Sequence, residues 1–164
     1  MLRRFAVAAV ALVASSSNAG HLRAEGSTEK GPLILQGRWT GEGTLKPEGA
    51  PQEKFKCVAT YFPAKLGHEV KQNLRCQSHS YKFDIASLFE IDGEKVSGTW
   101  REKTYEFEGA IDGVVKKDRY DVRLSGDFFE ADMVIEGTAC QQMLTVTPTP
   151  DMHIEYMTAF LKKC

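Results

Sequence analysis

The sequence predicts an all-β protein, an antiparallel up-and-down meander of about 8–10 short strands. Past residue 34, apolar and polar residues alternate with a period of two, which is typical of strands that have one buried face. Turn dipeptides such as Asp92-Gly93 and Asp112-Gly113 separate these runs at a spacing of roughly ten residues. This spacing leaves no room for crossover helices, so neighbouring strands should pair antiparallel and close into a barrel without exposed edges.

The expected strands follow one another along the chain with short turns between them. They span residues 36–45, 54–62, 69–77, 81–91, 95–102, 105–111, 119–124, 128–136, 140–147 and 153–163. The last segment could instead be a short helix, because Ile154, Met157 and Phe160 also fit one helical face. A strand is the favoured interpretation.

The pairing of neighbouring strands can be tested against the alternation, because a one-residue slip inverts every side chain. A hairpin centred on the first turn dipeptide pairs Phe89 with Val96. A hairpin centred on Ser125-Gly126 puts Val122 opposite Phe129. Both pairings place the large apolar side chains on one face of the sheet, which therefore becomes the predicted interior.

The chain divides into three predicted parts. Residues 1–19 have the features of a cleavable signal peptide: Arg3 and Arg4, then an apolar run of about ten residues, then small residues. Residues 20–34 are polar and aperiodic and should form a flexible N-terminal segment. Residues 35–164 should form a single β-barrel domain. The apolar run is too short to span a bilayer, so we expect a periplasmic or secreted protein and not a transmembrane one.

The charge balance gives little support for a polyanionic partner. The chain has 21 Lys and Arg against 22 Asp and Glu, a formal net charge of −1. The two signs alternate along the sequence and do not cluster, which argues against nucleic acid as a partner.

Four cysteines lie in the predicted barrel domain, an even number in a protein expected to be exported. Cys57 and Cys76 are symmetric about a polar turn, and Cys140 and Cys164 are symmetric about Met152 in a proline-containing break. Residues that are symmetric about a hairpin turn face each other across the two strands. We therefore predict the disulfides Cys57–Cys76 and Cys140–Cys164.

Two sets of residues carry a resemblance to known families. Gly37-Arg38-Trp39 resembles the Gly-x-Trp start of calycin-type barrels, the lipocalin and fatty-acid-binding group. In those families a basic residue near the end of the last strand packs over the tryptophan, which makes Lys162 the candidate here. The segments 74–76, 80–85 and 97–102 look like those of small exported alphaproteobacterial proteins, which are generally uncharacterised. The resemblance implies a calycin-like barrel in the cell envelope.

Aromatic side chains share the predicted inward face, where they either fill the core or line a pocket for one small apolar ligand. The candidate ligand-lining residues are Trp39, Tyr61, Tyr81, Phe83, Trp100, Phe107 and Lys162. Core filling and a ligand pocket both remain open at this stage.

No catalytic or cofactor motif stands out in the sequence. The histidines lie outside any triad spacing, and the cysteines fit neither Cys-x-x-Cys nor a zinc pattern. We therefore expect no catalytic residues, no metal and no cofactor. The leading hypothesis is an exported, non-enzymatic protein that binds a small hydrophobic ligand. The alternative is a protein–protein module, such as a hydrolase inhibitor or an envelope-integrity factor with an envelope protein as partner.

Overall fold

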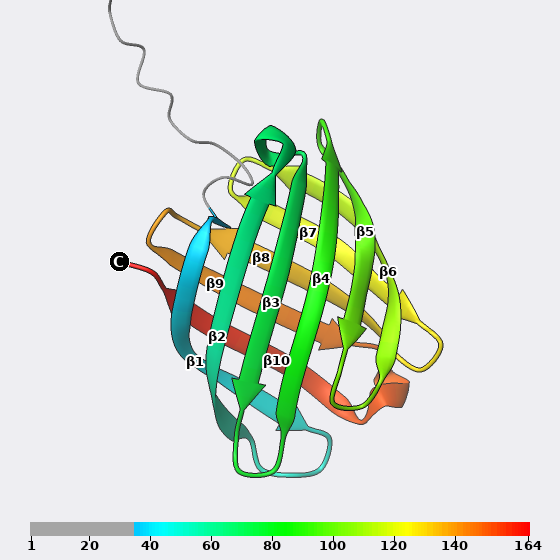
Figure 1. Ribbon diagram of the computed structural model, residues 1–164. Helices are drawn as coiled ribbons and strands as arrows, with labels where there is room; N and C mark the ends of the chain where they lie inside the picture. Colours follow the sequence, from blue (N-terminus) through cyan, green and yellow to red (C-terminus); the bar gives the residue numbers. More distant parts are fainter. Residues whose placement is uncertain (1–34) are drawn as a thin grey trace, which may run out of the picture.

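Ten antiparallel strands form a closed barrel in the order β1-β10-β9-β8-β7-β6-β5-β4-β3-β2 (Figure 1). The computed structural model describes residues 35–164; the predicted signal peptide and flexible segment lie outside the described residues. The strands are β1 (Gly37–Pro47), β2 (Glu53–Ala64), β3 (Glu69–Gln77), β4 (Lys82–Asp92), β5 (Lys95–Glu102), β6 (Phe107–Lys116), β7 (Arg119–Gly126), β8 (Glu130–Gly137), β9 (Gln141–Pro148) and β10 (Ile154–Lys162). Two short 3-10 turns, η2 (Lys65–Gly67) and η3 (Pro150–Met152), complete the described elements. The predicted barrel is confirmed.

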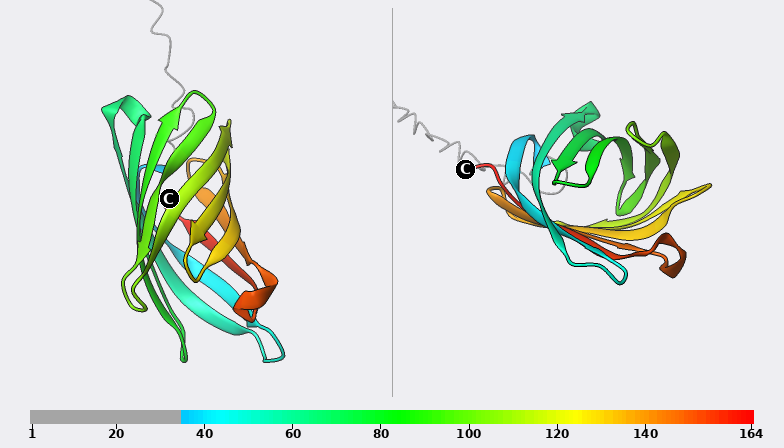
Figure 2. Two further views of the ribbon diagram at one scale, coloured as in Figure 1. Left: turned by 90° about the vertical axis from the view of Figure 1, so that its right-hand side faces the viewer. Right: turned by 90° about the horizontal axis from the view of Figure 1, so that it is seen from below.

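Alternation along each strand separates the interior from the surface. In β3, for example, Val70, Gln72 and Leu74 are buried while the residues between them are exposed. Seen from one end, the green strands β3–β5 and the yellow-to-red strands β8–β10 face each other across this interior (Figure 2). The core is therefore the inside of the barrel.

The last segment is a strand and not a helix. β10 pairs with β9 on one side and with β1 on the other, so it closes the barrel. A helix at this position could not supply the two ladders of backbone hydrogen bonds that closure requires.

The predicted hairpin pairings had the wrong register, but they placed the side chains on the correct face of the sheet. Asp92 pairs with Lys95, so the β4–β5 loop is Gly93-Glu94, and Phe89 faces Gly98 rather than Val96. Gly93 has a φ of 61°, which glycine adopts without strain at the first position of a tight hairpin loop. The shift is two residues, and an even shift keeps every side chain on its predicted face.

The β7–β8 pairing differs from the prediction by a larger even shift. Val122 faces Met133 rather than Phe129, because β7 continues to Gly126 and the loop occupies residues 127–129. Phe129 is therefore a loop residue that packs against the core from the end of the barrel.

Both predicted disulfides are confirmed. Cys57 and Cys76 face each other directly across β2 and β3, with their Cα atoms 4.2 Å apart. Cys140 and Cys164 lie beyond the ends of β9 and β10, with their Cα atoms 5.1 Å apart. The expectation that this second pair lies directly opposite was wrong, since the ladder between these strands is one residue out of that symmetry.

The basic residue over the first tryptophan is Lys163, so the prediction of Lys162 was wrong. Lys163 Nζ lies 4.8 Å from the centre of the Trp39 ring and also donates to the Gln36 carbonyl at 2.9 Å. Leu161 points inward and is fully buried, so the next residue, Lys162, points outward and lies over the Phe160 ring. The chain leaves the strand after Lys162, which frees Lys163 to fold over the end of the barrel.

Candidate functional site

The barrel interior has two different ends. At the end where η2 and both described termini lie, Trp39 is fully buried and its Nε1 donates to the Leu35 carbonyl at 2.7 Å. Tyr61 Oη donates to Gln142 Oε1 at 2.8 Å and accepts from Gln72 Nε2 at 3.1 Å. Burial raises the pKa of the Tyr61 phenol well above its ordinary value. This end is filled with side chains.

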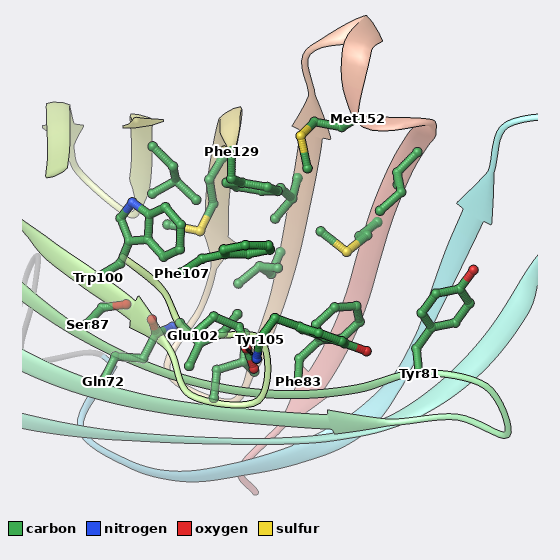
Figure 3. A pocket seen from close by; sticks show the side chains of 18 residues that line it. Gln72, Tyr81, Phe83, Ser87, Trp100, Glu102, Tyr105, Phe107, Phe129 and Met152 are labelled. Carbon is green, nitrogen blue, oxygen red and sulfur yellow. Dashed lines mark hydrogen bonds between the residues drawn. The ribbon is translucent and has the colours of Figure 1, made fainter. Parts of the chain in front are cut away.

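Toward the opposite end the interior holds a cavity of about 290 Å³ (Figure 3). It lies near the loops at residues 103–106, 127–129 and 149–153. Its lining is mostly apolar: six aromatic side chains and three methionines contribute to it, together with aliphatic residues. The aromatic and methionine members are Tyr81, Phe83, Trp100, Tyr105, Phe107, Phe129, Met133, Met152 and Met157. Methionine side chains adapt their shape readily, which suits a binding surface.

A row of aromatic rings connects the cavity with the surface. The ring centres of Phe83 and Tyr105 are 6.2 Å apart, those of Tyr105 and Phe107 are 6.3 Å apart, and Phe128 lies 6.2 Å from Phe107. Phe128 is 75% exposed and Tyr105 is 46% exposed, whereas Phe83 packs against the core. The row therefore runs from solvent into the barrel and marks the mouth of the cavity.

Polar groups gather on one side of the cavity. In Figure 3, Gln72, Ser87 and Trp100 lie on that side, opposite Tyr81 and Met152 near the mouth. Trp100 is 6% exposed and packs edge-on against Phe129, with the ring centres 5.4 Å apart. Its Nε1 is buried and has no hydrogen-bond partner within residues 35–164.

Glu102 is a charged residue in this otherwise uncharged lining. It is 4% exposed, and its two carboxylate oxygens accept from backbone N–H groups, Oε1 from Asp84 at 2.8 Å and Oε2 from Tyr105 at 2.5 Å. These two hydrogen bonds fix the carboxylate against the cavity wall and hold the turn that follows β5.

The structure divides the predicted ligand-lining residues into three groups. Tyr81, Phe83, Trp100 and Phe107 line the cavity. Trp39 and Tyr61 are buried at the filled end, and Lys162 lies on the outer surface. That these residues contact a ligand stays a prediction.

Sequence reasoning missed several residues of the lining. Tyr105 lies in a loop, where alternation gives no direction for a side chain. Phe129 was predicted to face the interior but was not among the candidate ligand-lining residues. Glu102 was detectable: in β5 it shares the inward parity of Val96 and Trp100. A charged residue at an inward position is the signal that could have found it.

Among residues 35–164, no group of three or more His, Cys, Asp or Glu side chains is placed to hold a metal ion. None of the helices described is long and apolar enough to cross a membrane.

The strand order defines the fold as a closed, ten-stranded antiparallel barrel, and solved structures of the same fold exist. Protein-family models and curated protein sequences give no match. Among 13 matching solved chains is the S-type phycobiliprotein lyase CPES from Guillardia theta, with a TM-score of 0.57 and 9% identity. The match covers 80% of this chain and 89% of the lyase.

A second solved structure is a protein of unknown function from the DUF3598 family of Nostoc punctiforme. It also has a TM-score of 0.57 and 9% identity. The match covers 80% of this chain but only 48% of that protein, so the chain spans about half of its length. At this identity, both likenesses show the shared fold alone.

The lyase contradicts the sequence-based prediction that the chain is not an enzyme. That prediction depended on the missing catalytic motifs and on the resemblance to binding proteins. A lyase that shares the fold shows that this architecture also serves catalysis, so neither argument excludes an enzyme.

Proposed function

We propose that the protein binds a small, largely apolar molecule inside its barrel, in an oxidising compartment outside the cytoplasm. The cavity beside Trp100 is the observation that carries the proposal. A protein interior leaves few voids larger than a water molecule, and one water needs only roughly 10–15 Å³ of such volume. The cavity of about 290 Å³ is far larger, and its size approaches the small end of the range of ligand pockets.

The composition of the lining supports an apolar ligand over trapped water. Aromatic and aliphatic side chains form most of the wall, and Gln72, Ser87 and Glu102 are its few polar members apart from the aromatic residues. Water in such a space would find few hydrogen-bond partners, whereas an apolar molecule would gain about 25 cal/mol for each Å² of surface removed from water. The proposal concerns binding, which a catalytic role for the same cavity would also require.

Two disulfides support the proposed compartment. Disulfides persist in the periplasm and outside cells and are rare in the reducing cytosol. Both bonds join residues that the barrel already holds close together, so they fit the fold without distortion of its ladders.

Binding can be tested with N-phenylnaphthylamine, an uncharged fluorophore that brightens in apolar surroundings. We expect saturable binding with one site per chain. The Val146→Phe variant places a ring in the cavity and should abolish the signal. The matched control Thr147→Phe adds the same ring to the exposed face of β9 and should bind as the parent does. Absence of saturable binding by the parent, or equal binding by Val146→Phe, would contradict the proposal.

A further inference from the structure

The charge on Glu102 restricts what kind of molecule the cavity accepts. This carboxylate is 4% exposed and belongs to the cavity wall. A charge removed from water is strongly destabilising unless a partner of opposite charge or hydrogen-bond donors compensate it. Two backbone N–H groups supply part of that compensation. Two donors leave the carboxylate with further acceptor capacity, because its two oxygens together offer about four lone-pair sites.

No side chain of the barrel supplies the missing positive charge. The cavity lining contains neither lysine, arginine nor histidine. Two cationic groups pair instead with Asp84, whose N–H donates to Glu102: Arg75 Nε and Lys103 Nζ lie 3.1 Å and 3.5 Å from Asp84 oxygens. Within residues 35–164, Glu102 forms no ion pair within 4.0 Å. Within residues 35–164, the Glu102 carboxyl therefore has two backbone donors and no cationic partner.

The neighbouring polar group also presents an acceptor. Gln72 is 2% exposed, and its Nε2 is committed to Tyr61 Oη at 3.1 Å. Its carbonyl oxygen accepts no hydrogen bond from the part of the chain that the structure describes, and the residue lines the cavity. Trp100 Nε1, a buried donor, would be satisfied by a neutral acceptor elsewhere on a ligand. The polar side of the cavity thus favours a ligand that brings hydrogen-bond donors to Glu102.

We propose that the ligand is a hydrophobic amine, protonated at neutral pH, whose ammonium group contacts Glu102. This inference rests on the proposed binding function and names the chemical class of the ligand. Phe107, Phe83 and Trp100 line the same space, and the faces of aromatic rings attract cations as well as apolar groups. An anionic ligand such as a fatty acid is disfavoured, because its carboxylate would face Glu102 without a neutralising cation.

A matched series of three small molecules tests the charge preference on the unaltered protein. Naphthylethylamine, naphthylethanol and naphthylacetate share one aromatic body and differ in a cationic, neutral or anionic end. Calorimetric titration at neutral pH should give the amine an affinity about ten- to hundredfold above that of the alcohol, as expected for a charge-assisted hydrogen bond. The carboxylate should bind more weakly than the alcohol.

The Glu102→Gln variant then tests whether Glu102 is the source of this preference. Glutamine keeps an oxygen that can accept a backbone N–H, so the turn after β5 should persist, which circular dichroism checks. The variant should lose about tenfold or more in affinity for the amine while its affinity for the alcohol changes little. Glu108→Gln, which neutralises an exposed carboxylate on β6, is the matched control and should bind all three molecules as the parent does.

The outcomes separate this inference from the function on which it rests. Equal binding of the three molecules by the parent overturns the amine preference but leaves apolar ligand binding intact. An amine preference that Glu102→Gln retains overturns the role of Glu102. If the parent binds none of the three, both the proposed function and this inference fail.

Discussion

The two tryptophans of this chain show how differently the two ends of the barrel interior are built. Both point inward from their strands. Trp39 is fully buried, its Nε1 is hydrogen-bonded to Leu35, and Lys163 covers its ring. Trp100 is nearly as buried, yet its Nε1 lacks a partner in the described chain and its ring borders a cavity of about 290 Å³. Burial alone therefore does not distinguish a structural residue from one that is available to a ligand.

The largest expected change in the free energy of unfolding comes from removing the ring of either tryptophan. Trp39→Ala should lower the free energy of unfolding by about 3–5 kcal/mol, because a well-packed side chain leaves an unfilled space. Trp100→Ala should cost at least about 1 kcal/mol less, since one side of its ring already faces a void and has fewer contacts to lose. Urea unfolding of both variants measures the difference. Equal losses would indicate that the two ends are packed alike.

The next two substitutions enlarge one inward side chain at each end of the barrel interior. Val96 is fully buried and Val146 lines the cavity. Val96→Phe should destabilise the barrel by about 1–3 kcal/mol through overpacking, whereas Val146→Phe should cost less than about 1 kcal/mol because the cavity accepts the ring. Thermal unfolding measured by circular dichroism gives both values. A larger loss for Val146→Phe than for Val96→Phe would show that the cavity is not open space.

A smaller effect separates two buried tyrosines by their hydrogen bonds. Tyr61→Phe should cost about 1–2 kcal/mol, because it leaves Gln72 and Gln142 without a buried partner. Tyr120 Oη is buried and has no partner within the described barrel, so Tyr120→Phe should be neutral or slightly stabilising. Chemical denaturation of the two variants is the measurement. A costly Tyr120→Phe substitution would reveal a partner for that hydroxyl.

The smallest expected effect is a change in stability at alkaline pH. Burial raises the pKa of Tyr120 above its ordinary value of 10.0, so the folded state keeps the phenol protonated where the unfolded state begins to lose its proton. The stabilising contribution is therefore complete below pH 10 and declines as pH rises above it. Between pH 10 and pH 10.5, Tyr120→Phe should lose roughly 0.4 kcal/mol less stability than the parent, as measured by unfolding at each pH. An identical pH dependence would mean that Tyr120 ionises freely in the fold.

Alternation and cysteine positions were enough to predict most of the fold. The number of strands, the closed barrel and both disulfides followed from them. The predicted registers of the two hairpins differ from the observed ones by two and four residues. A turn that contains glycine can be centred at several positions, and an even shift leaves every side chain on the same face, so alternation could not detect the error. The outward direction of Lys162 was missed because the turn before β10 is a 3-10 turn and not a symmetric hairpin loop.

The candidate site could be predicted only in part. Side-chain parity identified Trp100 and Phe107 as inward residues that could line a cavity. It identified Trp39 and Tyr61 in the same way, although they lie at the filled end. Parity reports the face of a sheet and contains nothing about the volume left between opposite walls. That volume depends on which residues meet across the barrel, and it appears only when the register of every strand is known.

The central claim is that ligand binds beside Trp100 and not at the filled end. Two indole N–H signals, one from each tryptophan, can be followed by nuclear magnetic resonance of isotope-labelled protein, with Trp39→Phe for assignment. Titration with N-phenylnaphthylamine should shift the Trp100 indole signal in a saturable manner and leave that of Trp39, bonded to Leu35, in place. A saturable shift of the Trp39 signal without one of Trp100, or no shift of either, would contradict the account.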